Sequence, residues 1–214
     1  SLRKFNSGQF EFDPMIDAED DQRYGMTLLA RPADKVKQRL SEIFQKIKSV
    51  APKQYYYPLS DLHLTVLPII SCYQGFSLRQ VNTDDYIAIV ASAIQSISPF
   101  NICFKGITAS PSCILIQGFP EDEQLNELRN NLRNQFRQTN LHHLIDRKYK
   151  LQTAHLTAIR FRQPLNQPKR FVKKLKNLRD TDFGDTMVSM LELAGNDWYQ
   201  RQENSQSIYE YSLA

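Results

Sequence analysis

The tripeptide His-Leu-Thr occurs twice in the chain, at 63–65 and at 155–157. Each copy lies in a short apolar run between turn-forming residues, so each is predicted to be part of a strand. Side chains two residues apart in a strand point to the same face, so the His and Thr of each copy share one face. The leucines between them point to the other face, where a core would bury them. Two such strands side by side would present two imidazoles and two hydroxyls to one small anion.

Two histidines and two threonines in this arrangement suit general acid–base catalysis at phosphorus. A neutral imidazole accepts a proton from water while a protonated imidazole gives one to the leaving oxygen. An unperturbed pKa of about 6.5 lets both forms exist near neutral pH. The hydroxyls of Thr65 and Thr157 can donate hydrogen bonds to phosphate oxygens. We therefore expect His63 and His155 to be catalytic, without a metal ion or other cofactor; the spacing alone does not say which is the acid.

Both tripeptides fall within a repeated order of elements predicted from apolar periodicity. A helix, a His-Leu-Thr strand, a second helix and two further strands follow one another twice, over about 34–118 and 121–213. A repeat of this length indicates two related lobes, and a pseudo-twofold axis between them would make the marked strands neighbours across a groove. The individual strands are expected at 24–30, 62–70, 101–107, 112–117, 154–161, 186–193 and 207–213, and the helices are expected to begin near residues 34, 83, 121 and 168.

The composition is that of one globular domain preceded by an acidic arm. The chain has 214 residues and 41% hydrophobic content, which is ample for a core. Residues 1–23 contain six acids and few apolar residues and are predicted to be the arm, so 24–214 would form the domain. No run approaches the length of a membrane span, and the three cysteines have no metal-ligand spacing. Cys103 and Cys113 fall in apolar runs and are most simply buried free thiols, which favours a reducing, cytoplasmic compartment.

Basic residues are concentrated in the C-terminal half. The net charge is +4, but 147–179 holds eleven Lys or Arg and no acid, which favours a phosphate-bearing partner. The cations of 169–179 are more simply explained as a solvated helix face.

Arg160 is a candidate phosphate contact, but strict alternation places it on the face opposite His155 unless the strand ends or bulges, so a structural role is equally open. Tyr57 could stack on a base or pack beneath its proline-bounded loop.

The paired motifs resemble those of the two-histidine (2H) phosphoesterase superfamily, which includes the bacterial RNA 2′,3′-cyclic phosphodiesterases, also called 2′-5′ RNA ligase-like proteins. The resemblance is carried by His-x-Thr-x at 63–66 and 155–158 and by the order of elements after residue 23. It implies a bilobal, duplicated α+β fold in which two antiparallel sheets flank a central basic groove, with helices on the outside. It also implies opening of a cyclic phosphate, typically a 2′,3′-cyclic end to a 2′-phosphate, with His63 as proton donor and His155 as acceptor.

The chain departs from this pattern in one place. Many RNA-type members have a basic residue soon after the first motif, where this sequence has Leu67-Pro68-Ile69, whereas Arg160-Phe161 resembles the usual continuation of the second.

The expected function is that of a metal-independent phosphoesterase opening a 2′,3′-cyclic phosphate of a nucleotide or RNA end. Two alternatives stay open. The same groove could bind a nucleotide or RNA phosphate without turnover, which the missing basic residue after the first motif favours. An unrelated two-lobed protein could bind RNA nonspecifically through its basic helix. The sequence does not indicate a protein partner or an oligomeric state.

Overall fold

The computed structural model describes residues 10–214. Its strands are β1 (Arg23–Ala30), β2 (Tyr55–Tyr56), β3 (Leu64–Gln74), β4 (Phe100–Ala109), β5 (Cys113–Pro120), β6 (Ala154–Arg160), β7 (Asp182–Val188), β8 (Met190–Asp197) and β9 (Gln206–Ser212). Its α-helices are α2 (Asp34–Lys48), α3 (Thr83–Ile94), α4 (Gln124–Arg137) and α5 (Pro168–Asn177). No helix within 10–214 is both long and apolar enough to cross a membrane.

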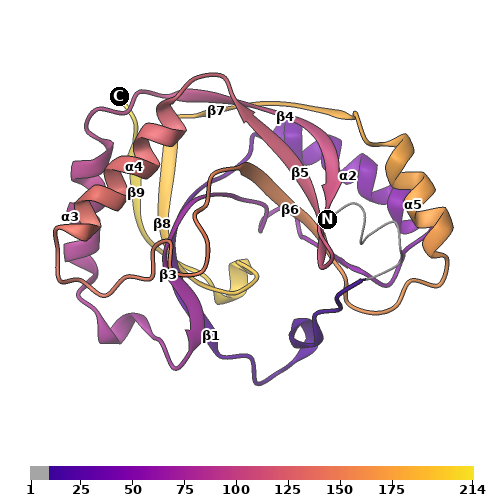
Figure 1. Ribbon diagram of the computed structural model, residues 1–214, viewed down its shortest axis with the longest axis horizontal. Helices are drawn as coiled ribbons and strands as arrows, with labels where there is room; N and C mark the ends of the chain where they lie inside the picture. The colour runs from indigo at the N-terminus through magenta and orange to yellow at the C-terminus, as the bar shows by residue number, and fades with distance from the viewer. Residues whose placement is uncertain (1–9) are drawn as a thin grey trace.

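The strands form one curled antiparallel sheet in the order β7-β4-β5-β6-β3-β1-β8-β9, with β2 paired to β6 (Figure 1). We call β3, β1, β8 and β9 the β3 half, and β6, β5, β4 and β7 the β6 half. Helices α3 and α4 cover the outside of the β3 half, and α2 and α5 cover the outside of the β6 half. The predicted α+β class is confirmed, and the two expected sheets are the two halves of this one.

The halves meet between β3 and β6, the strands that carry the tripeptides. Leu64 and Leu156 are the one antiparallel pair of residues that joins these two strands within the described chain. Antiparallel register about this pair sets the histidine of each copy opposite the threonine of the other. Both leucines are buried in the core behind the sheet. The predicted strands and the predicted burial of their leucines are therefore confirmed.

A buried arginine of α4 ties the two tripeptide strands together. Arg129 is 1% exposed, and its guanidinium donates hydrogen bonds to the backbone carbonyls of Thr65, Val66 and Thr153, at 3.1, 2.8 and 3.0 Å. No carboxylate between residues 10 and 214 forms an ion pair with it, and burial lowers its pKa to about 10. Because Thr153 lies two residues before His155, this one side chain fixes the two motifs relative to each other.

The C-terminal strands differ from the prediction. The apolar pattern predicts one strand at 186–193, but the chain forms β7 and β8, separated at Ser189. β7 pairs with β4 in the β6 half, whereas β8 pairs with β1 in the β3 half. Val188 and Leu191 are both buried on either side of the break, so the apolar pattern runs through the point where the chain crosses between halves.

Each predicted repeat supplies strands to both halves, because β3 belongs to one half while β4 and β5 belong to the other. The repeat boundaries at 34–118 and 121–213 stay a prediction.

Within the predicted acidic arm, Asp17 pairs with Arg162 at 3.0 Å and Asp21 pairs with Arg23 at 2.7 Å. Residues 1–9 of that arm lie outside the described residues, and the division of the chain after residue 23 also stays a prediction.

Replacing Arg129 with Met should lower the free energy of unfolding by about 3 kcal/mol, because three backbone carbonyls lose a buried donor. Urea denaturation measures the change. Arg137→Met is the matched control, since Arg137 is exposed on the same helix and its loss should cost less than about 0.5 kcal/mol. Similar losses of unfolding free energy in both variants would contradict the role of Arg129 in holding β3 and β6 together.

Candidate active site

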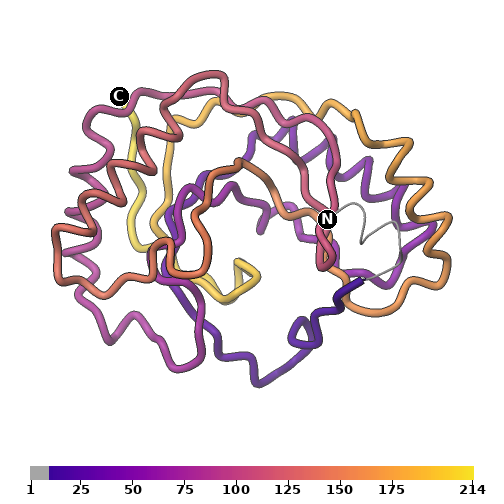
Figure 2. Tube along the Cα trace, viewed as in Figure 1, coloured from indigo at the N-terminus to yellow at the C-terminus, as the bar shows by residue number. Residues whose placement is uncertain are grey.

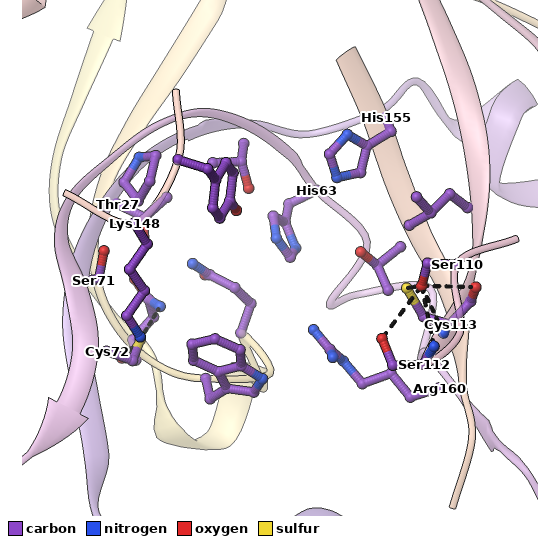
Figure 3. Close-up of a pocket in the computed structure, with 18 of the residues that line it drawn as sticks. Thr27, His63, Ser71, Cys72, Ser110, Ser112, Cys113, Lys148, His155 and Arg160 are labelled. Atoms are coloured by element: carbon purple, nitrogen blue, oxygen red, sulfur yellow. Dashed lines mark hydrogen bonds between the residues drawn. The ribbon is translucent and has the colours of Figure 1, made fainter. Parts of the chain in front are cut away.

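A cleft of about 530 Å³ lies over the seam between β3 and β6. All six side chains expected from the sequence to form a site line this cleft; they are His63, Thr65, His155, Thr157, Arg160 and Tyr57. Figure 3 shows the two histidines facing one hollow. On the side of Arg160 it is bounded by the β4–β5 turn, with Ser110, Ser112 and Cys113, and on the other side by Thr27, Ser71 and Cys72.

One ring nitrogen of His63 is committed to the backbone. Its Nδ1 lies 2.8 Å from the Asp61 carbonyl oxygen, which can only accept, so Nδ1 carries a proton and Nε2 is left for the cleft. Burial lowers the pKa of His63 to about 4, with a smaller opposing contribution from the Asp61 carbonyl and further lowering by Arg31, His155 and Arg160. With this pKa, His63 is neutral at pH 7 and its Nε2 is a hydrogen-bond acceptor.

His155 is held less strictly. Its Nδ1 lies 3.3 Å from the Thr153 hydroxyl oxygen, and a hydroxyl can donate or accept, so either tautomer is compatible with this contact. Burial is the main cause that lowers its pKa, and the positive charge of Arg129 adds to it. His155 is therefore also biased toward the neutral form.

A β-bulge follows each tripeptide and turns a later residue into the cleft. The β5–β6 register skips Ala158, and the β1–β3 register skips Val66. The extra residue shifts the phase of each strand, so the fifth residue after each histidine lines the cleft: Arg160 in β6 and Pro68 in β3. The bulge breaks the strict alternation of side chains that would have placed Arg160 on the face opposite His155. Arg160 therefore lines the same cleft as His155.

Tyr57 positions Arg160. The Arg160 Nε donates a hydrogen bond to the Tyr57 hydroxyl at 2.9 Å. Tyr57 is 3% exposed, and burial raises its pKa to about 12, so the hydroxyl stays protonated at neutral pH. This hydrogen bond orients the guanidinium at the cleft, while the base-stacking role suggested for the Tyr57 ring stays a prediction.

Two segments that sequence reasoning did not assign to the site also reach the cleft. Lys148 comes from the loop between α4 and β6, and Trp198 from the turn after β8. Figure 2 traces the loop and the turn side by side, and the Lys148 Nζ lies 5.8 Å from the centroid of the Trp198 ring. Nothing in the sequence separates Lys148 from the other cations of its basic segment.

The charge of the cleft favours an anion. Arg147, Lys148 and Arg160 line it, and Asp146 is the acid among its lining residues. That carboxylate is already paired with Arg133 at 2.8 Å, so it offsets little of the positive potential. The cations of α5 lie away from the cleft lining. Within residues 10–214, no group of three or more His, Cys, Asp or Glu is placed to hold a metal ion.

Comparison with known proteins gives structural matches. No protein-family model matches the chain, and no curated protein sequence matches it. Among solved structures, TT0787 of Thermus thermophilus is 17% identical with a TM-score of 0.65, over 88% of this chain and 97% of that one. E. coli LigT complexed with 3′-AMP is 11% identical with a TM-score of 0.58, over 90% and 99%.

A third structure, described as a phosphoesterase, is 11% identical with a TM-score of 0.57, again over 90% of this chain and 99% of the other. At these identities the likeness is one of fold. The chain therefore has the fold of E. coli LigT and of this phosphoesterase, which confirms at the level of fold the resemblance expected from its paired His-x-Thr motifs.

Proposed function

We propose that the protein is a two-histidine phosphoesterase that opens a 2′,3′-cyclic phosphate at the end of a nucleotide or RNA. The observation that carries this proposal is the meeting of both His-Leu-Thr motifs, from strands about ninety residues apart, in one electropositive cleft. The fold shared with LigT, solved in complexes with ATP and with 3′-AMP, supports a nucleotide phosphate as the ligand.

In this proposal the phosphate lies between the two imidazoles. The hydroxyls of Thr65 and Thr157 and the guanidinium of Arg160 bind its non-bridging oxygens and stabilise the charge that develops there. His155 removes a proton from a water molecule whose oxygen attacks phosphorus. The bond from phosphorus to the ribose 3′ oxygen breaks, and His63 Nε2 gives its proton to that oxygen. The products are a 2′-phosphate and a 3′-hydroxyl, in the order of roles that the family resemblance implies.

The acid must hold a proton before the reaction, although the pKa of His63 is about 4. A phosphodiester anion beside the ring favours the imidazolium and raises this pKa. The Asp61 carbonyl acts in the same direction by accepting from Nδ1. Binding of the anionic substrate and protonation of His63 are therefore coupled, so that the charged acid forms when substrate is present.

The deciding experiment is a panel of 2′,3′-cyclic nucleotides, RNA with 2′,3′-cyclic ends and 2′-5′ linked dinucleotides, incubated with EDTA, with the phosphate position of each product determined. We expect 2′-phosphate products and a bell-shaped dependence of the rate on pH. Binding of these compounds without any product would replace the proposal with the alternative of a non-catalytic nucleotide- or RNA-binding module.

His63→Ala and His155→Ala should each lower kcat at least about 100-fold, because each removes a proton-transfer group. Thr65→Ala and Thr157→Ala should lower kcat/KM about tenfold, since each removes one hydrogen bond to the phosphate. His142→Ala is the control, because that histidine is exposed and lies outside the cleft lining. Wild-type turnover in both cleft histidine variants would refute the assignment.

Sulfate, which stays a dianion across this pH range, should raise the melting temperature more at pH 5.5 than at pH 8. In the folded protein without ligand, the pKa of His63 lies below its value of about 6.5 in the unfolded chain. A bound anion raises the pKa of the folded protein's His63. Anion binding therefore takes up a proton and tightens as the pH falls. Thermal melts with and without sulfate measure this. The variant carrying both His63→Gln and His155→Gln should lose most of the pH dependence, and an unchanged dependence would contradict the coupling.

A further inference from the structure

The end of β8 and the turn that follows it hold two buried side-chain oxygens that accept no hydrogen bond from residues 10–214. They are Asn196 Oδ1 and Gln200 Oε1, and both residues line the cleft although only 2% and 4% exposed. A buried acceptor without a donor is costly, so a native structure seldom leaves two at one cleft unless something fills them. Both oxygens therefore indicate a ligand group that donates hydrogen bonds.

The amide of Asn196 has a defined orientation. Its Nδ2 donates to the Asp197 carbonyl oxygen at 2.8 Å and contacts Cys72 Sγ at 3.5 Å. Rotating the amide by 180° would set two oxygens against each other, so Oδ1 is the atom left without a donor. The backbone thus commits the donor end of this side chain and leaves its acceptor end without a donor among residues 10–214.

Gln200 has a backbone conformation that non-glycine residues seldom adopt. Its φ is 58°, which lies in the left-handed region. The turn is held in place by Asp197, whose Oδ1 accepts from the backbone N–H groups of Tyr199 and Arg201 at 3.0 Å each. A strained residue in a turn with this much support, carrying a buried unpaired acceptor, fits a preformed binding site.

Trp198 lies between these two amides in sequence and lines the same cleft. Its indole is half-buried, and cations surround it: the Arg23 and Arg160 guanidinium carbons lie 4.9 and 6.0 Å from the ring centroid. An accessible indole beside cations suits a nucleobase that is joined to a phosphate. The chain therefore offers a stacking surface and two acceptors on one turn.

We infer that the 196–200 turn binds the nucleobase of the substrate, with Trp198 stacking on the base and Asn196 Oδ1 and Gln200 Oε1 accepting from its exocyclic amino group. The inference rests on the proposed function only in that the phosphate of the same ligand occupies the two-histidine cleft. The substrate class becomes a nucleotide whose base carries an amino group, so adenine, cytosine and guanine are favoured over bases that lack one.

Trp198 is the single tryptophan of the chain, so its fluorescence reports this subsite without any need for turnover. The probes are adenosine 2′-monophosphate and the 2′-monophosphate of purine riboside, which differ only by the 6-amino group, and inorganic phosphate. We expect adenosine 2′-monophosphate to quench the fluorescence and to bind about tenfold more tightly than its purine counterpart, while phosphate binds without comparable quenching. Equal affinities for the two nucleotides, or no quenching by either, would overturn the inference.

Gln200→Met keeps the length of the side chain and removes Oε1, so it should reduce the tenfold preference for the amino group to about twofold. Gln202→Met is the matched control, because Gln202 is exposed and lies outside this cleft, and it should keep the full preference. A preference retained in Gln200→Met would count against the inference. If that variant does not fold, the comparison of the two ligands on the wild-type protein still decides.

Turnover is assayed separately on the 2′,3′-cyclic phosphates of adenosine and purine riboside. Quenching with the amino preference but no turnover would leave the base subsite standing and remove the proposed activity. Turnover of both compounds at equal kcat/KM would leave the activity standing and overturn the base subsite.

Discussion

The guanidinium of Arg129 beneath the seam is the contact on which the rest of the site depends. β3 and β6 share a single residue pair, which is too little to hold the two motif strands in register. Arg129 adds hydrogen bonds to carbonyls next to both motifs. Because no acid within the described chain pairs with it, its charge also contributes to the lowered pKa of His155. One buried side chain thus fixes the spacing of the two motifs and adds to the positive potential at His155.

The two motif strands are alike in backbone but not in chemistry. Each has a bulge after its threonine, and each then turns its next cleft residue inward, yet one strand supplies Arg160 and the other Pro68. The guanidinium of Arg160 therefore comes from the β6 side, whereas the β3 side offers the amides of Asn196 and Gln200. A near-symmetric backbone carries an asymmetric site, and an asymmetric site can give a nucleotide one direction of binding.

Sequence patterns predicted most of the elements and the meeting of the two motifs, because apolar periodicity and the two-residue repeat of strands are local properties. They missed what tertiary structure decides. Arg129 and Arg133 are buried in α4, where helical periodicity gives no reason to place an arginine. The face of β6 on which Arg160 lies depends on the bulge in its pairing with β5. The break at Ser189 arises because β7 pairs with β4 whereas β8 pairs with β1. Trp198 reaches the cleft only because its turn folds back over the seam.

Two of the four α-helices of the described chain, α2 and α4, are exchanged between the halves of the sheet. α2 follows β1 of the β3 half but packs against β7 of the β6 half, and α4 follows β5 of the β6 half but packs against α3 and β3. Each half consequently completes its core with a helix that the chain enters from the opposite half. Contacts of such long sequence separation cost loop-closure entropy before they form, which slows folding. A fragment that ends between the two motifs would lack part of both cores, so each half depends on the other to complete its packing.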